Sequence, residues 1–152
     1  MYKCKYFAPE ELAPPDVCRG YQDRGRVYDL FDENALRILD MIREWAGVGL
    51  TVNNWLWGGS RTMSGFRPRE STVGAARSAH KPDMPTRKAC AFDIVSPKIT
   101  AAQLWALIDK NADNLPCKIR IERTSGGKPI TWLHFDTNIS AGQKEKVYYF
   151  NA

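Results

Sequence analysis

Apolar residues recur at helical spacing between Glu33 and Trp45. They lie three or four positions apart and comprise Ala35, Leu36, Ile38, Leu39, Met41, Ile42 and Trp45. This spacing gathers them on one face, which predicts an amphipathic helix. Asp32 is the expected N-cap of this helix, and Gly47 is its expected stop.

Two further segments carry helix signals. Thr100 is the expected cap of a helix that carries Leu104, Leu107 and Ile108 and ends at about Asn114. Near the start of the chain, the stretch from Pro9 to Leu12 predicts a short helical turn, and Pro14-Pro15 predicts an extended segment after it. We expect residues 1–31 to form an N-terminal arm that packs on the core of a single domain, 1–152.

Short apolar or alternating segments predict strands. They cover Leu50–Val52, Phe92–Val95, Lys118–Arg123, Ile130–Asp136 and Val147–Phe150. The turn residues Ser125-Gly126-Gly127 predict a hairpin with a long loop between the third and fourth of these. Together the elements predict an α+β fold in which helices pack on one face of an antiparallel sheet.

The alternation along two strands predicts one polar face. Successive side chains of a strand point to opposite faces of the sheet. The side chains expected on the apolar face are Ile119, Ile121, Leu133 and Phe135. Those expected on the open face are Lys118, Arg120, Glu122, Trp132, His134 and Asp136. We therefore expect a polar cleft on the side away from the helices.

Composition narrows the classes of partner. The formal net charge is +5 and the pI is about 9.1, which favours an anionic partner such as nucleic acid or a bacterial wall. Lysine and arginine are spread from Lys3 to Lys146 without a dense block, which is typical of a solvated surface. We therefore predict no nucleic-acid interface. A basic nucleic-acid-binding module is kept as an alternative hypothesis, which rests on the net charge alone.

The start of the chain and the cysteines bear on location. Met1–Tyr6 has charge but no apolar run behind it, so neither a signal peptide nor a membrane span is expected. The cysteines, which are Cys4, Cys18, Cys90 and Cys117, form no CxxC pair. We expect a protein made in the cytoplasm with reduced thiols.

The chain has only two histidines, and each has a carboxylate nearby. Asp93 follows His80, and Asp136 follows His134. Two imidazoles and one carboxylate suit Zn²⁺, and three protein ligands leave a fourth position open for water. We predict His80, Asp93 and His134 as metal ligands, whereas Cys90 points away from Asp93. Asp136 either orients a ligand or simply begins the next turn.

Four short motifs occur in order along the chain: Ser64-Gly65-Phe66-Arg67, Ser78-Ala79-His80, Ala89-Cys90-Ala91-Phe92-Asp93 and Trp132-Leu133-His134. Their order resembles the zinc D-Ala-D-Ala carboxypeptidase and murein endopeptidase family, which includes phage endolysins. The resemblance covers roughly Phe7 to Asp136. It departs between His80 and Asp93, where the spacing is six residues longer and Ala89 replaces a glycine. Turn-forming residues there predict a longer loop.

The resemblance implies a Hedgehog/DD-peptidase-like fold and a zinc peptidase that cuts peptidoglycan stem peptides. By the same resemblance Arg67 would hold the substrate and its developing oxyanion, and Ser78 would contact the substrate. The expected protein is a monomer, a phage or prophage endolysin that acts on the wall after release or as a virion component. Trp55, Trp57 and Trp132 either line its groove or belong to the core.

The catalytic base is the main departure from the family. Many members carry an acid three residues before the last histidine, where this chain has Thr131. Glu122 is the predicted substitute because it shares the face of His134, and Asp136 is the reserve. Glu122 could instead pair with Arg120 or Lys118. The second hypothesis is therefore a non-catalytic zinc-binding virion or wall-binding protein.

Overall fold

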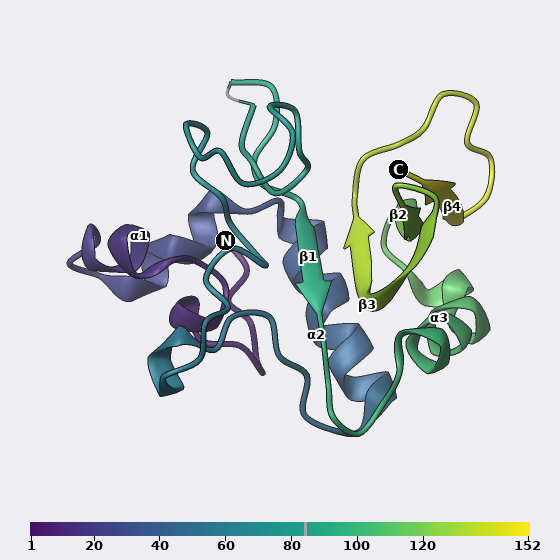
Figure 1. The fold of residues 1–152 in the computed structure, drawn as a ribbon, viewed down its shortest axis with the longest axis horizontal. Coiled ribbons are helices and arrows are strands. Elements are labelled where there is room, and N and C mark those ends of the chain that lie inside the picture. Colours follow the sequence, from purple (N-terminus) through teal and green to yellow (C-terminus); the bar gives the residue numbers. More distant parts are fainter. Residues whose placement is uncertain (84) are drawn as a thin grey trace.

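The computed structural model describes residues 1–83 and 85–152, and it confirms an α+β fold (Figure 1). The helices are α1 (Pro15–Arg19), α2 (Glu33–Ala46) and α3 (Ala101–Lys110), with 3₁₀ segments at Pro9–Glu11, Arg24–Leu30, Trp55–Trp57 and Ala112–Asn114. The strands are β1 (Ala91–Ile94), β2 (Ile119–Ser125), β3 (Lys128–Asp136) and β4 (Val147–Asn151). None of the described helices is long and apolar enough to span a bilayer.

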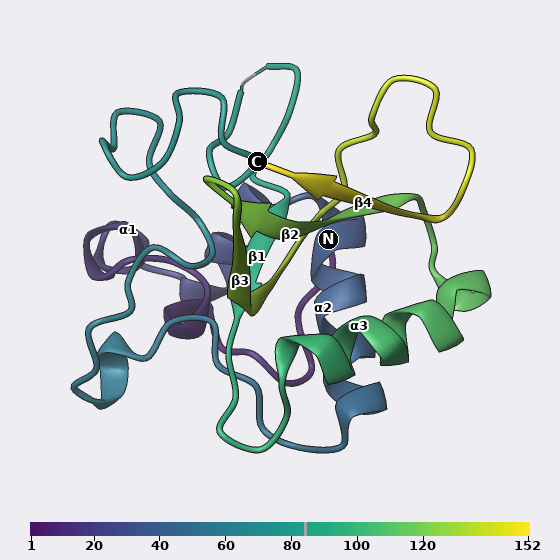
Figure 2. The ribbon, with the colours of Figure 1, turned by 45° about the vertical axis from the view of Figure 1, so that its right-hand side comes forward.

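The sheet is mixed, so the prediction of a purely antiparallel sheet was wrong. The strand order is β1-β3-β2-β4, with antiparallel pairing at β1–β3 and β2–β3. β4 pairs with β2 in parallel. The reason is that the connection over residues 137–146 passes β2 at the end of the sheet where β3 ends and β2 begins. β4 therefore starts on the far side of β2 from β3 and runs in the direction of β2 (Figure 2). A tight turn after β3 would instead have paired β4 with β3 as an antiparallel hairpin.

The caps of the two long helices confirm their predicted starts. The Asp32 carboxylate accepts a hydrogen bond from the Ala35 N–H at 3.1 Å, and Gly47 ends α2 with a φ of 65°. Thr100 accepts from the Gln103 N–H at 3.1 Å, and the Gln103 side chain accepts from the Thr100 N–H at 2.9 Å. Such reciprocal bonds satisfy two otherwise free donors at the start of α3.

Three local predictions were wrong. Pro14-Pro15 does not extend the chain, because Pro15 is the first residue of α1, where a missing N–H costs nothing. Leu50–Val52 forms no strand but only an isolated bridge between Thr51 and Val95. The β2–β3 hairpin has a tight turn rather than a long loop, since Gly126 and Gly127 take φ values of 58° and 77°.

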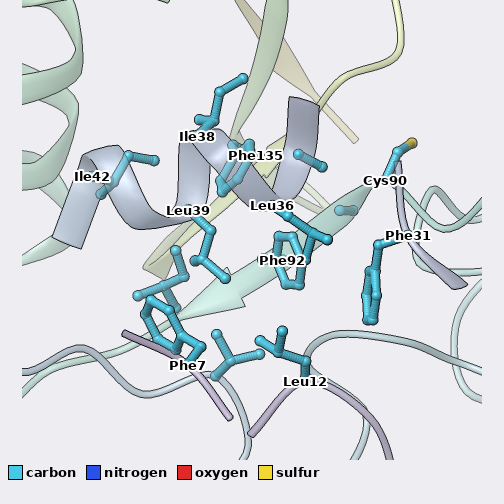
Figure 3. Close-up of a cluster of buried hydrophobic side chains, with 14 of the residues drawn as sticks. Phe7, Leu12, Phe31, Leu36, Ile38, Leu39, Ile42, Cys90, Phe92 and Phe135 are labelled. Carbon is cyan, nitrogen blue, oxygen red and sulfur yellow. The ribbon is translucent and has the colours of Figure 1, made fainter. Parts of the chain in front are cut away.

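The apolar face of the sheet packs against α2. Phe92 of β1 and Phe135 of β3 lie against Leu36 and Leu39 of α2, and Phe7 of the N-terminal arm lies in the same cluster (Figure 3). All of these side chains are buried. Leu104 and Ile108 of α3 belong to the same hydrophobic cluster. This core fixes the strands that carry the polar face.

Candidate metal site

Three polar residues form one row across the sheet. In the strand register Asp93 of β1 is opposite His134 of β3, and His134 is opposite Glu122 of β2. Residues that pair directly across strands project from the same face. The row therefore lies on the face opposite Phe92 and Phe135, which confirms the predicted polar face.

His80 reaches this row from a loop. The segment before β1 forms loops next to the start of that strand in both ribbon views (Figures 1 and 2). Main-chain hydrogen bonds tie these loops together: the Arg67 N–H donates to the His80 carbonyl at 2.9 Å, and the Asp93 N–H donates to the Ser64 carbonyl at 2.8 Å. His80 is thereby held in place and is buried.

The structure brings the three predicted ligands together. His80 Nε2 lies 3.3 Å from Asp93 Oδ1, and His134 Nδ1 lies 2.7 Å from the same oxygen. One ligand atom from each residue lies within 4.8 Å of the others. The cluster is thus a possible metal site, formed from a loop and two adjacent strands.

The remaining nitrogen of each imidazole is held by an acceptor. His80 Nδ1 lies 2.8 Å from the Gly65 carbonyl oxygen. His134 Nε2 lies 3.2 Å from Asp136 Oδ2. A carbonyl or carboxylate oxygen can only accept, so His80 Nδ1 and His134 Nε2 each carry a proton. Asp93 Oδ1 is also an acceptor, 2.7 Å from His134 Nδ1, so this nitrogen carries a second proton while no metal is bound. When neutral, the two rings present the lone pairs of His80 Nε2 and His134 Nδ1 toward Asp93, as metal-binding histidines do.

Charge within the cluster agrees with this arrangement. Burial alone would raise the pKa of Asp93, but the two imidazoles hold it well below its ordinary value. Burial alone would lower the pKa of His134, but hydrogen bonds with Asp136 and Asp93 raise it to about 9. Burial lowers the pKa of His80. In the absence of a metal, a proton on His134 therefore offsets part of the carboxylate charge.

Asp136 lies behind His134 and orients its ring. Its side chain is fully buried, and Arg120 donates to both of its oxygens at 2.8 and 2.9 Å. The Asn138 N–H donates to Oδ1 at 3.0 Å. Both oxygens are thus engaged, which makes Asp136 unsuited to the reserve role of a base. Of its two sequence interpretations, the structure favours the orienting one.

Glu122 lies on the wall of the cleft above the cluster. The cleft measures about 460 Å³, and its walls include Arg67, Ser78 and Trp132. Glu122 is half-buried, and burial raises the pKa of its carboxyl group. Among the described residues it forms no ion pair. The two cations considered for it are engaged elsewhere: Arg120 binds Asp136, and Lys118 Nζ donates to the Gln143 carbonyl at 2.7 Å.

Arg67 lies at the second oxygen of Asp93. Its Nη2 is 3.2 Å from Asp93 Oδ2, and its Nε donates to the Met63 carbonyl at 2.7 Å. Gly74 packs against Nη1, since a Cβ at that position would lie 2.5 Å from it. Ser78, by contrast, uses its hydroxyl locally, because its Oγ accepts from the His80 N–H at 3.3 Å.

Thr131, at the position of the family's usual base, and two of the predicted groove tryptophans lie outside the cleft. Thr131 lines a separate surface hollow with Trp105, so it does not reach the cleft. Trp55 donates its Nε1–H to the Ala13 carbonyl at 2.9 Å, and Trp57 is 66% exposed. Neither tryptophan is among the described residues that line the cleft.

The longer loop between His80 and Asp93 is tied back to the site. Asp83 and Arg87 form a bridge that closes a turn, and Arg87 donates to the carbonyls of Ser78 and Ala79 at 3.2 Å. Met84, which belongs to the predicted loop, lies outside the described residues. The extra residues therefore do not displace His80 from Asp93.

Sequence reasoning missed Phe150 as a residue of the cleft. Its ring centroid lies 6.1 Å from that of His134, and the Arg120 guanidinium lies 4.5 Å from its ring centroid. Alternation along β4 would have placed Phe150 on one face, but it could not have shown that β4 lies beside β2.

Comparison with known proteins gave no match, either to a protein-family model, to a curated protein or to a solved structure. A proposal about function therefore depends on the geometry of the site.

Proposed function

We propose that this protein is a zinc-dependent peptidase that hydrolyses the stem peptides of peptidoglycan, on a DD-peptidase-like fold and as a phage or prophage endolysin. The observation that carries the proposal is the orientation of the two imidazoles. His80 Nε2 and His134 Nδ1 both face Asp93, while their other nitrogens contact an acceptor. Two nitrogens and one carboxylate match the ligand set of catalytic zinc.

When bound, zinc would polarise the amide carbonyl and lower the pKa of a water molecule toward neutrality. His80, Asp93 and His134 would hold it, and the cleft leaves access for a substrate from one side.

Glu122 would serve as the general base. It is opposite His134 in the register and lines the same cleft. Burial raises its pKa, which brings the carboxyl group closer to the range where it can both accept and return a proton. Glu122 would take a proton from water and pass it to the leaving amine. The location of Thr131 on another surface is consistent with the base coming from β2 instead.

Arg67 would bind the oxygen on which negative charge develops. Two of its nitrogens are fixed, Nη2 by Asp93 and Nε by the Met63 carbonyl. Nη1 forms no hydrogen bond with the described residues and lies next to Gly74, on the wall of the cleft. A fixed guanidinium donor next to the reacting carbonyl is a means of stabilising an oxyanion.

The test is hydrolysis of purified peptidoglycan by the wild type and by Glu122→Gln. We expect turbidity loss and new amino groups with the wild type, abolition by a chelator, and recovery with zinc. Glu122→Gln should retain zinc and lose about 10²–10⁴-fold in rate. Glu145→Gln is the matched control, because Glu145 is exposed and is not among the described residues that line the cleft. Hydrolysis that resists the chelator, or full activity of Glu122→Gln, would contradict the proposal.

The second candidate is a non-catalytic zinc-binding protein of the virion or the wall. It is favoured by the absence of an acid at the position of Thr131. One zinc per chain without hydrolysis of peptidoglycan from several species would select this candidate over the peptidase.

A further inference from the structure

Arg120 holds the buried carboxylate that orients His134. Its Nε and Nη2 donate to the two oxygens of Asp136 at 2.8 and 2.9 Å. Asp136 is fully buried, whereas 23% of the Arg120 side chain is exposed. The guanidinium therefore lies between the carboxylate and solvent. Two parallel hydrogen bonds fix the plane of the carboxylate, which one donor could not do.

Phe150 covers this ion pair from the neighbouring strand. The Arg120 guanidinium carbon lies 4.5 Å from the centroid of the Phe150 ring. The same ring meets the His134 imidazole edge to face, with centroids 6.1 Å apart. One aromatic ring thus contacts both ends of the series Arg120–Asp136–His134. Its position depends on the parallel pairing of β4 with β2, which places Phe150 next to Glu122.

The contacts around His134 restrict the rotation of its imidazole ring. Asp93 contacts Nδ1 of the ring at 2.7 Å and Asp136 contacts Nε2 at 3.2 Å, so the two carboxylates together define its orientation. Without the two hydrogen bonds from Arg120, the Asn138 N–H would still hold Oδ1 of Asp136. Oδ2, which contacts His134, would lose its donor from Arg120, and the orientation of the imidazole would be less defined. Substitution of a group that hydrogen-bonds to a metal ligand commonly lowers the metal affinity by about 10–100-fold.

We propose that Arg120 and Phe150 are positioning residues that hold Asp136 against His134 and thereby set the affinity of the metal site. The inference rests on the proposed zinc binding by His80, Asp93 and His134. It adds that β2 and β4, neither of which contributes a ligand, affect how tightly the metal is held.

The chain offers a matched control on the same strand. Arg123 also contacts aromatic rings, with its guanidinium 3.6 Å from the centroid of Tyr149 and 5.2 Å from that of Trp105. It is exposed and forms no ion pair among the described residues. Arg123 therefore reproduces the residue type, the strand and the aromatic packing, but not the contact with Asp136.

The experiment measures zinc affinity by competition with a chromogenic chelator for wild type, Arg120→Lys, Phe150→Leu and Arg123→Lys. Lysine keeps the positive charge beside Asp136 but replaces the fork with a single ammonium group. We expect about a tenfold or greater loss of affinity in Arg120→Lys, a smaller loss in Phe150→Leu, and none in Arg123→Lys. Thermal melts of the metal-free proteins show whether each variant is folded.

A second measurement separates positioning from general loosening of the fold. The visible absorption of the cobalt-substituted protein reports the geometry of the ligands. It should change in Arg120→Lys and stay the same in Arg123→Lys. If both Arg120→Lys and Phe150→Leu bound zinc as tightly as the wild type and had its cobalt spectrum, the positioning role would be wrong, but the proposed function would still stand. Absence of zinc binding by the wild type would overturn the proposed function as well.

Discussion

The two faces of the sheet differ in what holds their side chains, although the residues involved are neighbours in the chain. Phe92 and Phe135 face α2 and are held by apolar packing, whereas Asp93 and His134, one position away, are held by hydrogen bonds and charge. A slip of one residue in the register would exchange the two sets. The apolar face thus fixes the register, and the register forms the candidate site.

Substitution on the apolar face should have the largest effect on folding. Phe135→Ala removes a fully buried ring that packs against Phe92, and we expect a loss of about 3–5 kcal/mol in the free energy of unfolding. Urea unfolding of the metal-free protein measures it. Tyr148→Ala is the control, because Tyr148 is 43% exposed. A loss below about 1 kcal/mol in Phe135→Ala would mean that the two faces do not differ in this way.

The polar face should instead respond to pH. Burial alone would lower the pKa of His134, but its carboxylate partners raise it to about 9 in the metal-free protein, while an unfolded histidine has a pKa of about 6.5. The folded state therefore binds this proton more tightly. Its contribution to stability is complete below about pH 6.5 and is lost as the pH rises through about 9.

Unfolding of the metal-free protein between pH 6.5 and 9.5 tests this expectation. The free energy of unfolding should fall by roughly 2–3 kcal/mol over that range. His134→Gln, which has no imidazole to titrate, should show a smaller fall. A wild-type profile that is flat, or that rises, would contradict the proposed charge state of the cluster.

A smaller effect on the free energy of unfolding is expected at Asp32, whose hydrogen bonds hold the start of α2, the helix that covers the apolar face. The Asp32 carboxylate caps α2 and accepts a second hydrogen bond from the Thr137 hydroxyl at 2.8 Å, just after β3. Asp32→Ala should lower the free energy of unfolding by about 0.5–2 kcal/mol. Asp32→Asn keeps an acceptor and should lose less. Equal stability of all three proteins in denaturant titrations would show that the cap has no role in holding α2 on the sheet.

The smallest effect on stability is expected at Glu122. This residue is half-buried and has no ion pair among the described residues, so Glu122→Gln should change the free energy of unfolding by no more than about 0.5 kcal/mol. The same variant should lose hydrolytic activity if Glu122 is the base. A marked loss of stability, measured by urea unfolding, would indicate a structural role for Glu122 instead.

The sequence predicted elements with strong local signals. The period of α2, the caps Asp32 and Thr100, and the alternation over β2 and β3 all depend on residues close together in the chain. The metal ligands could be proposed because the two histidines and Asp93 lie in three of the four short motifs that carry the family resemblance. Their grouping in space agrees with that proposal.

Features that depend on distant pairing could not be predicted. β4 has the same alternation whether it runs parallel or antiparallel to its neighbour, so its partner had to come from the structure. Counting back from the turn at Gly126-Gly127 would place Glu122 opposite Thr131. The register shift between Glu122 and Thr124 instead places it opposite His134. A register shift of this kind has no clear signature in a single sequence.

The most direct test of the account is the zinc content of the purified protein, measured for the wild type and for His80→Ala. His80 belongs to the candidate metal cluster but lies in a loop rather than in the sheet, so its replacement should leave the fold in place. The account predicts about one zinc per wild-type chain and none in folded His80→Ala. No zinc in the wild type, or equal zinc in both proteins, would contradict it.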